Sequence, residues 1–102
     1  MSAAGPDEPV LDEDGLLRVG DRWVAIPDAQ LPIVELLLSK PLKVVRYDEI
    51  IVRYRQAGGT ARWAGVRSML TRLAGRLRTV GLDLTAVRSR GVVLHPAQGF
   101  PR

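Results

Sequence analysis

The segment over residues 60–80 constrains the fold more than any other part of this chain. Its apolar side chains recur at spacings of three and four residues, which places them on one stripe of a helix. They are Trp63, Val66, Leu70, Leu73, Ala74 and Leu77, with Met69 and Val80 at the edges. The opposite side carries Arg67, Arg72, Arg76 and Arg78 around a ridge of small residues, Ala64, Ser68, Thr71 and Gly75. The pattern predicts a helix that is anchored in a core and whose outer surface can come close to a polyanion.

This pattern by itself leaves several interpretations of the helix open. Its outer face could enter a groove of DNA, or its arginines could simply be solvated, as on many surface helices. A helix lying on a membrane surface would show a similar stripe, but a chain of 102 residues needs this apolar face to close its core. The order of the surrounding elements has to distinguish among these interpretations of the helix.

Charge is unevenly distributed along the chain. Residues 1–35 hold eight acidic and two basic side chains, a net charge of −6, whereas residues 36–102 hold thirteen basic and three acidic ones, a net charge of +10. A concentrated positive half favours a polyanionic partner, with nucleic acid first and an anionic membrane second. Solubility alone would also explain it.

Short strands are predicted before the first helix. Residues 1–9 are small, acidic and polar, which predicts a disordered tail. Residues 16–19 and 22–26 are rich in β-prone side chains, and the Gly20-Asp21 pair between them predicts a hairpin turn. Residues 10–12 add an edge strand, so the N-terminal part is predicted to form a small antiparallel sheet.

Two helices are predicted between this sheet and the long basic helix. Asp28 is a good N-cap residue for the first, and Pro32 is tolerated only in its first turn. Residues 42–45 form a short extended link into the second helix, over residues 47–56. A glycine turn follows, and Thr60 is the predicted N-cap of the long helix.

A β-hairpin is predicted after the long helix. Residues 82–87 and 92–94 are extended, the segment Arg88-Ser89-Arg90-Gly91 makes the turn between them, and residues 96–102 form a flexible tail. Sheet, helix, helix, turn, helix and basic-tipped hairpin, in this order, make an α+β winged helix-turn-helix domain over residues 10–95. In this fold the third helix reads the major groove of DNA and the hairpin is the wing.

Side chains suited to catalysis or metal binding are scarce. There is one histidine, His95, and there is no cysteine, so a disulfide or thiolate site is excluded and neither a zinc site nor a catalytic triad is supported. We expect His95 to be an exposed or strand-end histidine, and Trp23 and Trp63 to be core residues. No enzymatic activity and no cofactor are expected.

Residues 16–94 resemble the OmpR/PhoB-type winged-helix domain, the DNA-binding half of many bacterial response regulators. Residues 26–31 resemble the start of its first helix, and residues 40–45 its Asn-Pro-Gly-x-Val-Val link. Residues 66–77 follow its recognition-helix pattern Val-Asp-Val-His-Ile-Ser-Arg-Leu-Arg-Lys-Lys-Leu, and residues 86–94 its wing pattern Thr-Val-Arg-Gly-x-Gly-Tyr-Arg-Leu. The resemblance implies a sequence-specific transcriptional regulator that binds duplex DNA.

The resemblance also implies roles for residues at the matched positions. Arg72 matches an arginine that approaches bases in the major groove, and Met69 and Thr71 match neighbouring groove-facing positions. Arg88 matches the wing arginine that approaches the minor groove. Arg76 matches a basic position, which implies a contact with the DNA backbone.

The remaining predicted contacts surround these positions, with the recognition helix over residues 61–80 and the wing over residues 84–94. Arginines and a serine near the groove are expected to hold phosphates, which gives affinity without sequence information. They are Arg62, Arg67, Arg76, Ser89 and Arg90. Ser68, on the small ridge, completes the predicted DNA-contacting set.

Departures from the family pattern limit what the resemblance implies. Ala74 and Gly75 stand where basic residues are usual, and Val92 stands where tyrosine is usual, so no operator sequence can be copied from a relative. The 102 residues hold no receiver domain, which predicts an orphan regulator or a piece of a longer one.

The expected partners are duplex DNA, RNA polymerase and a second copy of the chain on repeated half-sites, with no membrane. The expected location is the cytoplasm, at the nucleoid. The competing interpretation is a winged-helix module that binds other proteins, because a fold does not fix a function.

Overall fold

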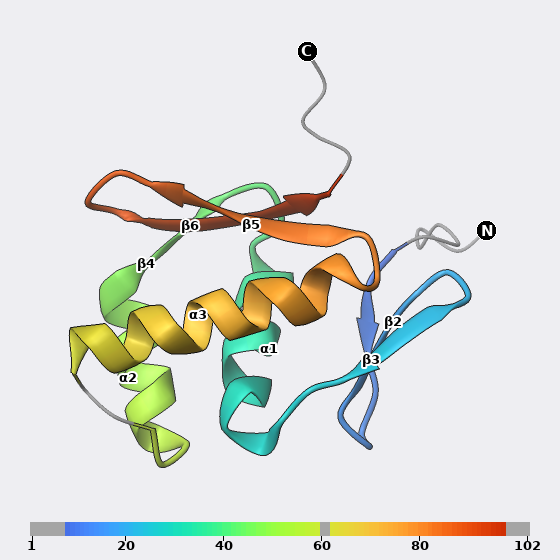
Figure 1. The fold of residues 1–102 in the computed structure, drawn as a ribbon, viewed down its shortest axis with the longest axis horizontal. Helices are drawn as coiled ribbons and strands as arrows, with labels where there is room; N and C mark the ends of the chain where they lie inside the picture. Colours follow the sequence, from blue (N-terminus) through green and yellow to red (C-terminus); the bar gives the residue numbers. More distant parts are fainter. Residues whose placement is uncertain (1–7, 60–61, 98–102) are drawn as a thin grey trace.

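Three α-helices and two three-stranded antiparallel sheets make up the fold of residues 8–59 and 62–97, which the computed structural model describes (Figure 1). The C-terminal sheet lies along one side of α3, and the N-terminal sheet lies beside the helices (Figure 1). This is the predicted α+β winged helix-turn-helix fold. Among the described residues, no helix is long and apolar enough to cross a membrane.

The N-terminal sheet has the strand order β1-β2-β3 and follows the prediction closely. Its strands are β1 (Val10–Leu11), β2 (Leu16–Val19) and β3 (Arg22–Ala25). Gly20 turns the chain between β2 and β3 with a φ of 62°, a conformation that glycine adopts without steric cost.

The Asp12 carboxylate organises the turn between β1 and β2. Its Oδ1 accepts hydrogen bonds from the backbone N–H groups of Asp14, at 2.9 Å, and Leu16, at 3.0 Å, and its Oδ2 lies 3.3 Å from Arg18 Nε. The N–H of Leu16 first, and then that of Asp14 and the Arg18 guanidinium, favour the ionised carboxylate and lower the pKa of Asp12.

The three helices are α1 (Leu31–Ser39), α2 (Tyr47–Gln56) and α3 (Trp63–Arg78). Pro32 lies in the first turn of α1, as predicted. The predicted N-cap role of Asp28 is wrong: Asp28 begins a short 3-10 helix, η1 (Asp28–Gln30), and makes no capping hydrogen bond. Pro27 fixes the chain direction before η1, and this tighter turn replaces the expected first turn of the α-helix.

α3 begins later than predicted. Arg62 occupies its N-cap position in an extended conformation, and the helix ends at Arg78, with a turn at Thr79 and Val80. The predicted N-cap residue, Thr60, lies outside the described residues. Gly81 takes a φ of 87° and turns the chain into the next strand, a role that glycine commonly has just after a helix.

The C-terminal sheet contains one strand more than the predicted hairpin. β5 (Leu82–Val87) and β6 (Gly91–Pro96) form the wing, and β4 (Val44–Arg46) pairs with the other edge of β6. The link between α1 and α2, predicted to be extended over residues 42–45, is a strand over Val44–Arg46, and its pairing with β6 was not predicted. The predicted tail starts too early, because Pro96 belongs to β6 and the N–H of Ala97 donates to the Gly81 carbonyl at 2.8 Å. The rest of that tail, residues 98–102, lies outside the described residues.

Gly91 permits β4 to lie against β6. It pairs with Arg46, and a Cβ atom at this position would collide with the backbone of Val45 and Arg46. A side chain here would force the strands apart, so the third strand of the sheet depends on this glycine.

The apolar stripe of α3 forms the centre of the core. Val66, Met69, Leu73 and Leu77 are at most 1% exposed and belong to one cluster with residues of every other helix and both sheets. The prediction that the two tryptophans are core residues is wrong: the exposed fraction is 60% for Trp23 and 44% for Trp63.

His95 lies at a strand end, as predicted, but it is buried rather than exposed. Its ring connects β5 and β6. Nδ1 lies 2.7 Å from the Pro96 carbonyl oxygen and Nε2 lies 2.6 Å from Thr85 Oγ1. In the neutral ring with a proton on Nδ1, that N–H donates to the carbonyl and Nε2 accepts from the Thr85 hydroxyl.

We predict that Gly91→Ala lowers the free energy of unfolding by at least ~2 kcal/mol, because the new methyl group meets rigid backbone. Gly75→Ala is the matched control. No atom lies within 4 Å of its Cβ position, and it lies inside α3, so the same change should raise stability by up to ~1 kcal/mol. Urea unfolding measures both, and equal effects of the two substitutions would contradict the proposed role of Gly91.

We predict that Asp12→Ala lowers the midpoint of thermal unfolding more than Asp12→Asn, which keeps a side-chain acceptor for the turn. Because folding lowers the pKa of Asp12, its stabilising effect is present above the ordinary aspartate pKa and is lost as the pH falls through the lowered value. Thermal melts between neutral and acidic pH should show the Asp12→Ala deficit shrinking in acid. A deficit that stays constant with pH would contradict this.

Candidate nucleic-acid interface

The outward face of α3 combines a low ridge with two arginines. All four ridge residues, Ala64, Ser68, Thr71 and Gly75, are exposed. At ~100° per residue, Arg67 and Arg72 lie on opposite flanks of the ridge. The surface is hollowed along the ridge between them, over Ala64, Ser68 and Thr71. This face of α3 therefore presents to solvent a narrow strip of small side chains with an arginine on each side.

Arg67 and Arg72 are the two arginines of α3 that are exposed without an ion pair to any described residue. Both are exposed, and neither makes an ion pair or side-chain hydrogen bond with any described residue. Thr71, on the ridge, donates its hydroxyl proton to the Arg67 carbonyl oxygen at 3.0 Å, so it can offer a partner mainly its lone pairs.

The other two arginines of α3 are held closer to the domain surface, Arg78 by an ion pair and Arg76 by partial burial. The Arg78 Nε lies 3.2 Å from Asp83 Oδ1 at the start of β5. Arg76 is half-buried, and its Nε is covered by protein without a hydrogen-bond partner among the described residues. Arg76 therefore has less freedom to reach a DNA backbone than its sequence position suggests.

The resemblance implied that Met69 faces the DNA groove, and the structure contradicts this. Its side chain is fully buried beneath α3. It lies one residue before Leu70 and three after Val66, and both of these are also buried. Its place at the edge of the apolar stripe predicted its environment better than the alignment with the family pattern did.

The tip of the wing presents three exposed polar side chains together, Arg88, Ser89 and Arg90. The Arg90 N–H donates to the Val87 carbonyl at 3.0 Å and closes the turn, in which Ser89 takes a φ of 59°. The Arg90 carbonyl in turn accepts from the N–H of Tyr47 at 3.0 Å. The start of α2 therefore fixes the wing tip.

The wing tip and the N-terminal half of α3 lie at the same end of the domain. β5 follows α3 and lies alongside it in the opposite direction, so the end of β5 at the wing tip is near the first turn of α3 (Figure 1). Arg62, exposed directly before α3, lies at this end as well. At ~1.5 Å per residue, Arg78 lies about 16 Å along the axis from Arg67. The basic residues of the interface are thus concentrated toward one end.

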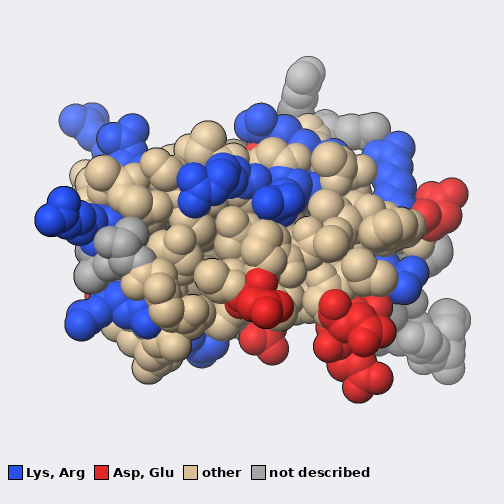
Figure 2. Space-filling model, turned by 60° about the horizontal axis from the view of Figure 1, so that its bottom comes forward, with Lys and Arg blue, Asp and Glu red and all other residues tan. Residues whose placement is uncertain are grey.

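Acidic side chains lie mostly elsewhere. In the face of Figure 2, Lys and Arg side chains concentrate in the upper half and at the left, while Asp and Glu gather at the lower centre and lower right. This separation in space matches the separation along the sequence, with net −6 in residues 1–35 and net +10 in residues 36–102. The electrostatic potential of this face is therefore more positive in its upper half than at its lower centre and lower right.

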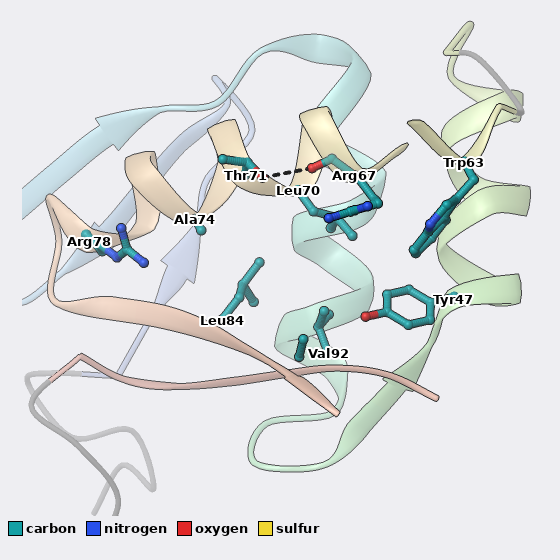
Figure 3. Close-up of a pocket in the computed structure, with 10 residues that line it drawn as sticks. Tyr47, Trp63, Arg67, Leu70, Thr71, Ala74, Arg78, Leu84 and Val92 are labelled. Atoms are coloured by element: carbon teal, nitrogen blue, oxygen red, sulfur yellow. Dashed lines mark hydrogen bonds between the residues drawn. The ribbon is translucent and has the colours of Figure 1, made fainter. Parts of the chain in front are cut away.

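A pocket between α3 and the C-terminal sheet was not predicted from the sequence. Its volume is about 260 Å³, and the ring of Tyr47, at the start of α2, packs edge-on against Trp63 at its rim, with centroids 4.7 Å apart and planes at 79°. Arg67 also lines this pocket, and its guanidinium lies over Leu70 (Figure 3). Trp63 begins α3 one turn before the buried stripe, and periodicity cannot show that such a residue extends past the core.

Comparisons of the chain with protein-family models, with curated proteins and with solved structures gave no match. The fold is therefore described from the structure alone, and the chemistry of this surface has to support any functional conclusion.

Proposed function

We propose that this domain binds duplex DNA with sequence preference, as a bacterial transcriptional regulator of the OmpR/PhoB type. The observation that carries the proposal is the outward face of α3, a ridge of small residues flanked by Arg67 and Arg72, which make no ion pair with any residue that the structure describes. A major groove about 12 Å wide admits a helix, and small side chains on the leading ridge allow the helix backbone to come near the bases.

The geometry supports a division of roles among the arginines. Arg72 has the freedom to make a bidentate contact with guanine, worth ~1–3 kcal/mol of discrimination against another base. Arg67 on the other flank and Arg90 at the wing tip suit phosphate contacts, together with Arg62 and Ser89. Arg88 suits a narrow minor groove, where the potential is most negative.

Two residues of the sequence-based set have a reduced role in this proposal. Met69 is removed from it because its side chain is fully buried. Arg76 is at most a secondary backbone contact because its Nε is covered. Ser68 and Thr71 remain as groove-facing residues on the ridge.

We predict that Arg72→Ala and Arg90→Ala weaken DNA binding in different ways. Arg72→Ala should cost ~1–3 kcal/mol on a preferred site and little on an unrelated site, because it removes a base contact. Arg90→Ala should weaken all sequences alike and reduce the slope of log K against log salt by about one.

Fluorescence anisotropy with duplexes across a salt series measures both effects. Arg55→Ala, an exposed arginine on α2, is the matched control and should change neither. Weak binding without preference in the wild type, unaffected by Arg72→Ala, would reject the sequence-specific function.

We predict that Ser68→Leu reduces DNA affinity at least about tenfold, because a large side chain on the ridge keeps the helix out of the groove. Ser68 is exposed, so the folded domain should tolerate the change with a stability within ~0.5 kcal/mol of the wild type. Gln56→Leu, which is also at an exposed position and lies on α2, is the control. Unchanged DNA affinity in Ser68→Leu would show that the ridge does not meet DNA.

The remaining parts of the proposal rest on the resemblance. A cytoplasmic location at the nucleoid, a second copy on repeated half-sites, and contact with RNA polymerase follow from the function proposed for this class of regulator. Sedimentation with a duplex holding one or two copies of a preferred site would test the pairing of two copies.

One observation favours a protein partner as a second candidate function. Trp23 is 60% exposed on β3, an edge strand of the N-terminal sheet and therefore able to accept a further strand. Under this alternative, Trp23→Ala would abolish an interaction with another protein while DNA binding is absent or nonspecific. Loss of preferential DNA binding on Arg72→Ala would contradict it.

A further inference from the structure

We propose that the pocket between α3 and the C-terminal sheet binds a small aromatic carboxylate, and that this ligand competes with DNA for Arg67. The pocket lies beside the ridge of α3 and is lined by residues of α2, α3, β5 and β6 (Figure 3). Its ligand-binding part stands on the geometry alone, whereas the competition rests on the proposed function.

The walls of the pocket suit a flat apolar group. Aliphatic side chains from three elements line it: Leu70, Ala74, Leu84, Ala86 and Val92. Trp63 forms part of the rim and is 44% exposed, although indole is among the largest apolar side chains. A planar ring placed beside Trp63 would remove part of this surface from water without any change of the core.

Two hydrogen-bond donors that line the pocket lack partners in the described part of the chain. The Arg67 guanidinium and the Tyr47 hydroxyl make no ion pair or hydrogen bond with any described residue, and both side chains line the pocket. The Tyr47 hydroxyl points toward Val92, and Arg67 extends over Leu70 (Figure 3). A guanidinium offers a fork of N–H donors that matches the two oxygens of a carboxylate.

The other end of the pocket limits the charge and size of the ligand. Arg78 also lines it, but its Nε is paired with Asp83 at 3.2 Å, so Arg67 is the one cation of this pocket that makes no ion pair within the described residues. A volume of about 260 Å³ lies just below the ~300–1,000 Å³ of typical ligand pockets. These features together favour a monoanion with one or two rings over a multiply charged phosphate ester.

Occupancy of the pocket would alter the proposed DNA interface directly. Arg67 stands between the ridge of α3 and the pocket, and both hollows include it. A carboxylate bound to its guanidinium neutralises a phosphate contact and holds the side chain away from the ridge. The ligand would then lower DNA affinity without changing the fold.

The test uses benzoate as the probe and benzamide, its neutral analogue, as the comparison. The two tryptophans give two indole N–H signals in a ¹H–¹⁵N spectrum, and Trp23, in the N-terminal sheet, is the internal control. We expect benzoate to shift the Trp63 signal saturably and to leave Trp23 unchanged, with benzamide binding about tenfold more weakly. Equal affinity for the two probes, or equal shifts of both indoles, would overturn the proposal.

Two variants assign the donors. Arg67→Gln should remove the preference for benzoate over benzamide, and Tyr47→Phe should weaken benzoate binding several-fold, whereas Arg55→Gln should change neither. The matching spectra of the remaining amides check that each variant is folded. Full benzoate preference in Arg67→Gln would overturn the assignment of the carboxylate site.

Competition is measured as the DNA affinity in the presence of benzoate. The comparison sample holds chloride in place of benzoate at the same ionic strength. Benzoate should lower the affinity of the wild type several-fold and leave that of Arg67→Gln unchanged. Simultaneous binding of benzoate and DNA without mutual effect would refute the competition but not the pocket. A wild type that binds benzoate and no DNA would refute the proposed function and the competition together, and the probe titration would still decide the ligand site.

Discussion

Burial of the apolar stripe of α3 determines which of its side chains can reach a partner. Val66, Met69, Leu73 and Leu77 are almost completely removed from water, and burial of one such side chain contributes roughly 1.5–3 kcal/mol. Turning these four side chains outward would cost roughly 6–12 kcal/mol, which is comparable to the whole stability of ~5–15 kcal/mol of a typical domain. The opposite face, with its small ridge and its arginines, is therefore the one surface that α3 can offer to DNA or to any other partner.

The wing depends on the same core through β4. The segment between α1 and α2 pairs with β6, Gly91 allows the close approach, and the Tyr47 N–H holds the Arg90 carbonyl at 3.0 Å. Short hairpins are marginally stable alone, so the third strand and this tether fix the tip relative to α3. The proposed division between base contacts from the helix and backbone contacts from the wing requires such a fixed geometry.

Much of this fold was predictable from local pattern, and what was missed has a common physical cause. Helix α2, the N-terminal hairpin and β5 follow from periodicity and turn residues. Burial at the ends of elements does not, because it depends on how far neighbouring elements extend: Trp63, the first residue of α3, projects past the core. The burial of Met69, inside α3, agrees with the apolar stripe and not with the groove-facing position that the resemblance implied. The strand character of β4 depends on pairing with a partner almost fifty residues away. Of the predicted site, Arg67, Arg72 and the wing-tip arginines are exposed as expected, whereas the engagement of Arg76 and Arg78 depends on packing and on Asp83.

The central claim is that the outward face of α3 selects among DNA sequences. Selection of bound duplexes from a random pool tests this most directly. We expect enrichment of a short motif that contains at least one guanine whose identity is constrained by Arg72. A pool that stays random through successive rounds, although DNA is retained at low salt, would contradict the account.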